Sequence, residues 1–321
     1  MKKFNSFLSP LIQAYIDYQK ASGRWNEASY EPNLILFDHY CQKQYPDSIV
    51  LTQEIVNNWC RKRKTENNNS CRSRIYVIVS FIRYFRKRGK IDIREPEIPR
   101  KERSLYIPHA FTREELKNFF YACDNIPDRR FTQEQRSRRI TIPVFFRLLY
   151  SSGIRTNEAR LLRMKNVDLY HGILDIRYSK GHTQYYVVLH DSMLDIMKKY
   201  DAVIRKQYPF RTYFFPARGD AFHIRAWVQT NFRQMWDKYN STYATAYELR
   251  HHYATENINN WTDEGFGFDA KLLYLSKSMG HSILESTRYY YSLVPGLADI
   301  IEDRTAESFN NIVPEVDYES N

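Results

Sequence analysis

The sequence predicts a mainly α-helical protein of two domains, with one small antiparallel β-sheet in the second domain. Only 10 of the 321 residues are glycine. Few glycines among many long polar side chains favour helices over a β-protein that needs many tight turns. Apolar residues recur at helical spacing through much of the chain, whereas alternation of apolar and polar residues marks residues 172–189. The length accommodates two domains.

The chain is strongly basic. It has 48 Lys and Arg against 37 Asp and Glu, a net charge of +11 and a sequence pI near 9.3. This excess indicates a polyanionic partner. We expect nucleic acid rather than a membrane surface, because no strongly apolar amphipathic face stands out.

The cysteines and the apolar segments indicate the compartment. The four cysteines form no CxxC pair and have no histidine at zinc spacing, so we expect neither a disulfide framework nor a metal site. No apolar run approaches the roughly 20 residues of a membrane span, and the amino terminus does not resemble a signal peptide. These features predict a cytoplasmic protein without a membrane partner.

The first domain is expected to be a small helical bundle. Ser9 and Pro10 predict an N-cap followed by proline at the first helical position. Apolar residues at helical spacing then predict four short amphipathic helices, within residues 9–23, 34–46, 52–59 and 75–89.

Basic residues gather on this bundle, and we expect them to contact DNA phosphates. The alternative is an ordinary solvated helix face. The predicted DNA-binding residues are Arg61, Lys62, Arg63, Lys64, Arg72, Arg74, Arg83, Arg86 and Lys87.

An extended basic linker is predicted over about residues 89–110, because three prolines interrupt a stretch without sustained periodicity. The sequence Thr112-Arg113-Glu114-Glu115 then predicts a capping box that opens a new helix. The expected domains are therefore residues 1–103 and 104–321.

The second domain contains three motifs with the residue types of phosphate chemistry. The first, Ser152-Gly153-Ile154-Arg155, has Glu158 three positions on, where a carboxylate can orient the guanidinium. The second is Glu248-Leu249-Arg250-His251, and the third is Gly280-His281 with Tyr290 nine residues later.

The order and spacing of these motifs resemble the tyrosine recombinase (phage integrase) family, over roughly residues 112–293. The hairpin residue Lys180 falls where that family carries a catalytic lysine. The resemblance implies a helical core-binding (SAM-like) domain followed by a mostly helical catalytic domain. The catalytic residues it implies are Arg155, Lys180, Tyr247, Arg250, His281 and Tyr290, with Glu158 and His251 in supporting roles.

The implied activity is site-specific DNA recombination through a 3′-phosphotyrosine intermediate, without a metal or high-energy cofactor. Arg155 and Arg250 would clamp the phosphate, because a guanidinium binds it in a bidentate fork. Tyr290 would be the nucleophile and Lys180 the acid for the leaving 5′ oxygen, and His281 would donate a hydrogen bond to the phosphate.

The resemblance also implies partners. The DNA partner is a double-stranded recombination site. The protein is expected to form a homotetramer on DNA through the apolar residues Leu297, Ile300 and Ile301 of its C-terminal tail. An accessory directionality factor is a further expected partner. An integrase or transposase of a prokaryotic mobile element is favoured over a chromosome resolvase, because Tyr247 stands where the family usually has histidine.

Several alternatives remain open on sequence alone. A phenol with a pKa of about 10 is a poor base near neutrality, so a DNA-binding protein with an impaired site is one alternative. A type IB topoisomerase is another. Lys180 is equally explained as a turn residue beside Gly181, and Tyr289 and Tyr291 are rivals of Tyr290 by adjacency.

Overall fold

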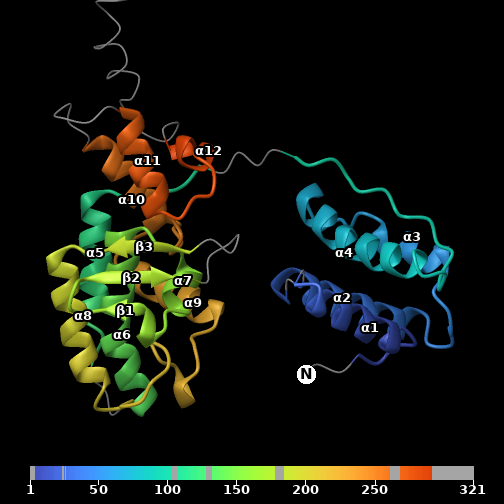
Figure 1. The fold of residues 1–321 in the computed structure, drawn as a ribbon, viewed down its shortest axis with the longest axis horizontal. Helices are drawn as coiled ribbons and strands as arrows, with labels where there is room; N and C mark the ends of the chain where they lie inside the picture. The colour runs from blue at the N-terminus through green and yellow to red at the C-terminus, as the bar shows by residue number, and fades with distance from the viewer. Residues whose placement is uncertain are drawn as a thin grey trace, which may run out of the picture. The chain divides into compact units, whose positions relative to one another are not determined.

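The fold is mainly helical with one small antiparallel sheet, as predicted (Figure 1). The computed structural model describes residues 4–23, 25, 27–102, 107–127, 132–177, 184–260 and 268–290. The chain divides into two compact units, residues 1–106 and 107–321. The division lies three residues beyond the boundary expected from the sequence.

The first unit is a bundle of amphipathic helices. Its helices are α1 (Ser9–Ala21), α2 (Glu27–Gln44), α3 (Gln53–Cys60) and α4 (Asn68–Arg86). Thr52 caps α3 by accepting a hydrogen bond from the Ile55 backbone N–H. The predicted N-cap at Ser9 is wrong: Leu8 is the N-cap and Ser9 begins the helix, with its hydroxyl donating to the Phe4 carbonyl.

The segment after α4 packs on the first unit, which the sequence did not predict. Ile93 is 3% exposed and belongs to the core formed by α1–α4. Arg72 donates to the Pro99 carbonyl over 2.8 Å, and the Gln53 side chain accepts from the Arg94 backbone N–H. Residues 91–102 form no helix or strand, and Ile91, Ile93 and Ile98 pack against the helices of the first unit. This part of the predicted linker therefore lies on the bundle.

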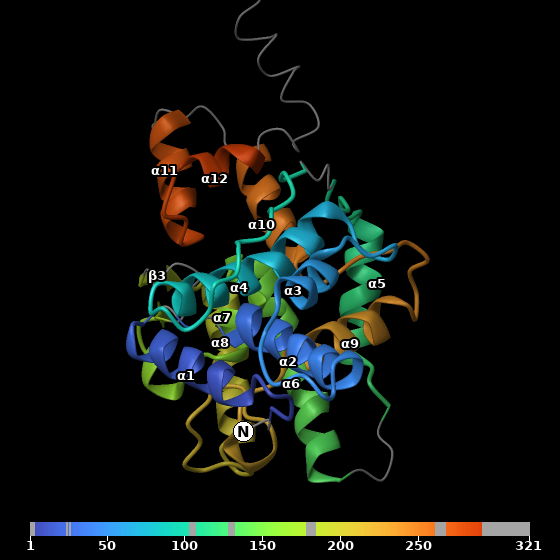
Figure 2. The same cartoon turned by 90° about the vertical axis from the view of Figure 1, so that its right-hand side faces the viewer.

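In the described part of the second unit, four other helices pack against one long helix, α6 (Gln133–Ser152). The helices, in chain order, are α5 (Arg113–Asp124), α6 (Gln133–Ser152), α7 (Thr156–Arg160), α8 (Asp191–Ile204), α9 (Arg225–Trp236), α10 (Glu248–Asn259), α11 (Phe268–Ser278) and α12 (Glu285–Arg288). Short 3-10 turns lie at Met164–Asn166 and Arg218–Asp220. The capping box between Thr112 and Glu115 is present. Helices α10, α11 and α12 gather at one end of this unit (Figures 1 and 2).

The predicted hairpin forms two strands of the sheet. Its strands are β1 (Val167–Asp168), β2 (Ile173–Ile176) and β3 (Tyr185–Val188), hydrogen-bonded in that order and antiparallel. Ile173 pairs with Val188, and Ile176 pairs with Tyr185. The predicted turn at Lys180 and Gly181 falls within residues 178–183, which lie outside the described part of the chain.

Gly153 is expected to be essential for the stability of the second unit. It ends α6 with a φ of +63°, and a Cβ atom there would lie 2.3 Å from Cδ1 of Tyr253. Gly153→Ala should therefore cost about 1–2 kcal/mol for the left-handed backbone and a further ~1–3 kcal/mol for the clash. Urea denaturation measures the loss. Gly219→Ala is the matched control in the same unit, because Gly219 has a φ of +67° and a Cβ atom there would meet nothing within 4 Å. Equal losses from both variants would contradict the clash.

Candidate active site

The turn between α6 and α7 presents Arg155 and its partner Glu158. Arg155 is the N-cap of α7, and its backbone N–H donates to Oε2 of Glu158 over 2.7 Å. Its Nη1 donates to Oε1 of the same carboxylate over 2.7 Å, and its Nη2 donates to the Gly280 carbonyl over 3.3 Å. Glu158 is only 3% exposed, so Arg155 is held by a desolvated carboxylate.

Helix α10 supplies the second arginine. Arg250 is 2% exposed and donates to the carbonyl oxygens of Gly153 and Met279. The start of α10 is fixed by Glu248, whose carboxylate accepts from the backbone N–H groups of Thr245 and His109. Arg250 therefore connects the first and third sequence motifs, which lie more than a hundred residues apart.

His281 accepts a hydrogen bond from Arg250 in this structure. Nη2 of Arg250 lies 2.9 Å from Nε2 of His281, and a guanidinium can only donate. The proton of the neutral ring therefore sits on Nδ1, which is 2.7 Å from the Thr287 hydroxyl. Burial, together with Arg250 and Arg155, lowers the pKa of His281 to about 4. The expected donation from His281 to a phosphate requires Nε2 to gain a proton and leave Arg250.

Tyr290 lies against this cluster. It is 3% exposed, and its ring stacks on His281 with centroids 6.1 Å apart and an interplanar angle of 10°. Burial raises the pKa of its phenol, and the positive charge of Arg250 opposes that rise. Tyr289 is 41% exposed, and Tyr291 lies outside the described residues. Of the two described tyrosines, Tyr290 is the one packed against His281.

Tyr247 and His251 complete the aromatic part of the site. Tyr247 is half-exposed at the N-cap of α10 and interacts electrostatically with both Arg155 and Tyr290. The ring of His251 lies 5.1 Å from that of Tyr247 and 5.4 Å from that of Tyr290. Burial lowers the pKa of His251 to about 4. His251, expected to support the arginines, also packs against the ring of the candidate nucleophile.

Two further residues bear on the site, one predicted from the sequence and one not. Lys180 falls outside the described residues. Tyr185, which the sequence analysis missed, is 9% exposed and donates to Oε2 of Glu158 over 2.6 Å. The available signal was a tyrosine at an inward position of an alternating strand, because a buried phenol usually requires a hydrogen-bond acceptor.

The predicted DNA-binding residues differ in how accessible they are. Arg74 is a correction: it is 4% exposed, paired with Glu66 and bonded to the carbonyl oxygens of Trp59 and Arg61. Its donors hold the turn between α3 and α4, so it cannot bind phosphate in this structure. Arg72 is half-buried, and its guanidinium donates to the Pro99 carbonyl. The exposed members are Arg61, Lys62, Arg63, Lys64, Arg83, Arg86 and Lys87, of which Arg83 is paired with Glu95.

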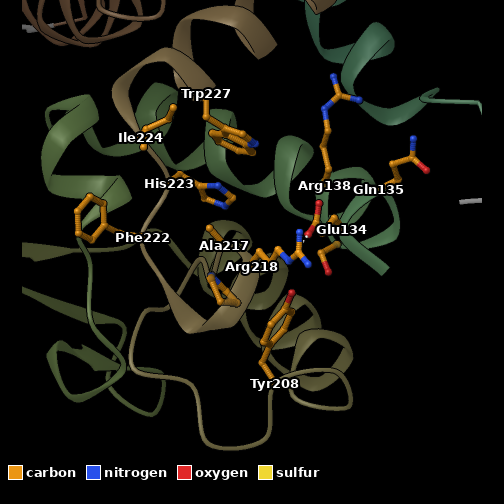
Figure 3. Close-up of a pocket in the computed structure, with 12 residues that line it drawn as sticks. Glu134, Gln135, Arg138, Tyr208, Ala217, Arg218, Phe222, His223, Ile224 and Trp227 are labelled. Atoms are coloured by element: carbon orange, nitrogen blue, oxygen red, sulfur yellow. Dashed lines mark ion pairs between the residues drawn. The ribbon is translucent and has the colours of Figure 1, made fainter. Parts of the chain in front are cut away.

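A pocket of about 390 Å³ lies elsewhere in the second unit (Figure 3). His223 and Trp227 stack in its wall with centroids 3.8 Å apart, and Arg218 pairs with Glu134 at its edge. None of its lining residues belongs to the site around Arg155 and Arg250. Across the described residues, no group of His, Cys, Asp and Glu side chains is arranged to hold a metal ion.

The comparisons with known proteins identify the family of the chain. Residues 110–295 match the phage integrase family. A tyrosine recombinase of Agathobacter rectalis is 23% identical over 299 residues, which cover 87% of this chain and 90% of the relative. The chain belongs to the phage integrase family, and its class, a tyrosine-type site-specific recombinase, is confirmed.

Solved structures share the fold. The Tn1549 transposon integrase in complex with transposon right end DNA aligns with a TM-score of 0.57 at 14% identity, over 92% of this chain and 99% of that one. A lambda integrase tetramer bound to a Holliday junction aligns with a TM-score of 0.53 at 13% identity, over 85% and 77%. In the described residues, no helix is both long and apolar enough to span a membrane.

The buried histidines predict a pH dependence of stability. His223 and His251 have pKa values lowered to about 4 by burial, below the usual value of about 6.5. As the pH falls below 6.5, the unfolded chain binds protons that the folded chain refuses, so the free energy of unfolding should fall between pH 7 and pH 5. Each histidine contributes at most about 1.4 kcal/mol per pH unit.

Chemical denaturation at several pH values measures this slope. His251→Gln and His223→Gln should each flatten it, whereas His39→Gln, at an exposed position of α2, should not. A slope unchanged in both of the first two variants would refute the assignment.

Proposed function

We propose that this protein cuts and rejoins DNA at specific sites through a 3′-phosphotyrosine intermediate formed on Tyr290. The observation that supports this proposal is the convergence of two arginines, a histidine and a tyrosine from distant segments of the chain. Arg155 and Arg250 donate to the adjacent carbonyls of Gly280 and Met279, and His281 and Tyr290 stack beside them. This set supplies positive charge and a nucleophile within one site.

The proposed reaction exchanges one phosphoester bond for another. The Tyr290 oxygen attacks the phosphorus and loses its proton, while the bond from phosphorus to the 5′ oxygen breaks and that oxygen gains a proton from Lys180. Arg155 and Arg250 neutralise the charge that develops on the non-bridging oxygens. A 5′ hydroxyl of another strand then attacks the phosphotyrosine and reverses the exchange.

The proposed nucleophile is buried. Tyr290 is 3% exposed, so its oxygen cannot meet a phosphate on a duplex without a movement of the segment that carries it. We infer that DNA binding opens this segment and gives the Tyr290 proton a route to Tyr247, to His251 or to water. The half-exposed phenol of Tyr247 is the candidate that solvent reaches directly.

The finer assignments are part of the same proposal. The substrate is a double-stranded recombination site, the working assembly is a tetramer, and the exposed basic residues of the first unit contact its phosphates. The recombination site belongs to a mobile element, and the protein acts in the cytoplasm of a prokaryote. The transposon integrase and the lambda integrase tetramer described above support these assignments by similarity.

Covalent capture of DNA in cells tests the proposal. Protein recovered under denaturing conditions should carry discrete DNA sites, and Tyr290→Phe should remove them, because the phenyl ring has no attacking oxygen. Tyr289→Phe is the matched control at the exposed neighbour and should retain the adduct. Equal background recovery from wild type and Tyr290→Phe, with both proteins folded and bound to DNA, would instead support a DNA-binding protein without cleavage.

Tyr247 should contribute to the rate through its hydroxyl. Tyr247→Phe is expected to slow cleavage about 100-fold or more, the lower end of a general acid–base contribution. Tyr247→His should restore the rate and add a dependence on a group that titrates near pH 6.5. Single-turnover cleavage measured from pH 5.5 to 9 distinguishes the variants, and a Tyr247→Phe protein as fast as wild type would exclude a role for this phenol.

A further inference from the structure

Tyr185 occupies a junction between three parts of the active site. It begins β3 and is buried, as is Val187, while Tyr186 and Val188 on the same strand face solvent. The alternation turns one face of the strand toward the turn between α6 and α7. Lys180 lies five residues earlier in the sequence.

The phenol of Tyr185 is bonded to the carboxylate that holds Arg155. Oε2 of Glu158 accepts from the Tyr185 hydroxyl over 2.6 Å and from the Arg155 backbone N–H over 2.7 Å. Oε1 accepts from the Arg155 guanidinium over 2.7 Å. With Glu158 only 3% exposed, removal of one donor leaves part of a buried charge unsatisfied, which is costly.

The ring of Tyr185 also touches the turn that carries His281. A Cβ atom on Gly280 would lie 2.3 Å from Cε1 of Tyr185, so the ring packs directly on the glycine backbone. The carbonyl of Gly280 accepts from Nη2 of Arg155 over 3.3 Å. The contacts therefore form a closed ring: Arg155 contacts Glu158, Glu158 contacts Tyr185, Tyr185 packs on Gly280, and Gly280 accepts from Arg155.

We propose that Tyr185 is a positioning residue of the cleavage reaction: its hydroxyl orients Glu158, and through it the Arg155 guanidinium, while its ring sets the turn before His281. This inference rests on the proposed function, because it assigns Arg155 to the scissile phosphate. A core tyrosine without this role would need only its ring, and the hydroxyl would be dispensable for the reaction.

The test uses a duplex that carries a site recovered by covalent capture, nicked beside the cleavage position so that the covalent product accumulates. Tyr185→Phe should slow single-turnover cleavage by about tenfold or more, the equivalent of one hydrogen bond to a charged group. Its Kd for the duplex should stay within about twofold of wild type. Tyr186→Phe removes the same hydroxyl from the exposed neighbour and should change neither quantity.

A second substrate separates positioning from damage to the fold. A methylphosphonate at the scissile position has lost the negative charge that an arginine neutralises, so the defect of Tyr185→Phe should shrink on it. In a Glu158→Gln background, Tyr185→Phe should add little, because the two changes break the same ring of contacts.

Each contrary result has its own meaning. A Tyr185→Phe protein that cleaves as fast as wild type, or one that is slowed equally on both substrates, would overturn the positioning role while leaving the phosphotyrosine proposal intact. A wild-type protein that forms no covalent product would overturn the proposed function, and this inference with it.

Discussion

The active site depends on a buried arginine that no described carboxylate neutralises. Arg250 is held by the carbonyls of Gly153 and Met279 and by the imidazole of His281. Burying a charge is expensive unless a partner compensates it. Glu158 pairs with Arg155, and no carboxylate among the described residues pairs with Arg250, so the two guanidinium groups together keep a net positive charge. Under the proposed function, the scissile phosphate would supply an anion that compensates this positive charge.

The hydrogen bonds of Arg250 also hold together motifs that lie far apart in the sequence. The carbonyl of Gly153 is available because α6 ends there in a left-handed residue, and the carbonyl of Met279 is available because α11 has ended at Ser278. Helix ends leave carbonyl groups without intrahelical partners. Arg250 satisfies two of these groups and so fixes α6, α10 and the turn before His281 relative to one another.

Local patterns in the sequence predicted the features that depend on local forces. Thr112 caps its helix as expected, and the third helix begins directly after Thr52, because capping requires only residues three positions apart. The boxes around Arg155, Arg250 and His281 were recognisable because their spacing is characteristic. Arg74 was misread, and the burial of Ile93 was not predicted, for the opposite reason: their burial depends on contacts with residues that no periodic pattern connects to them. Tyr185 escaped notice because its acceptor, Glu158, lies on a different element.

The burial of Tyr290 has a consequence for the safety of the genome that hosts such an enzyme. If only a small fraction of molecules exposes the nucleophile at any moment, the rate of accidental strand breakage falls in proportion to that fraction. Under the proposed function, random collisions with DNA then rarely lead to cutting, which takes place mainly in encounters that hold the segment open. Loosening the packing around Tyr290 would, under the same function, raise the cleavage rate on all DNA and so reduce the preference for the specific site.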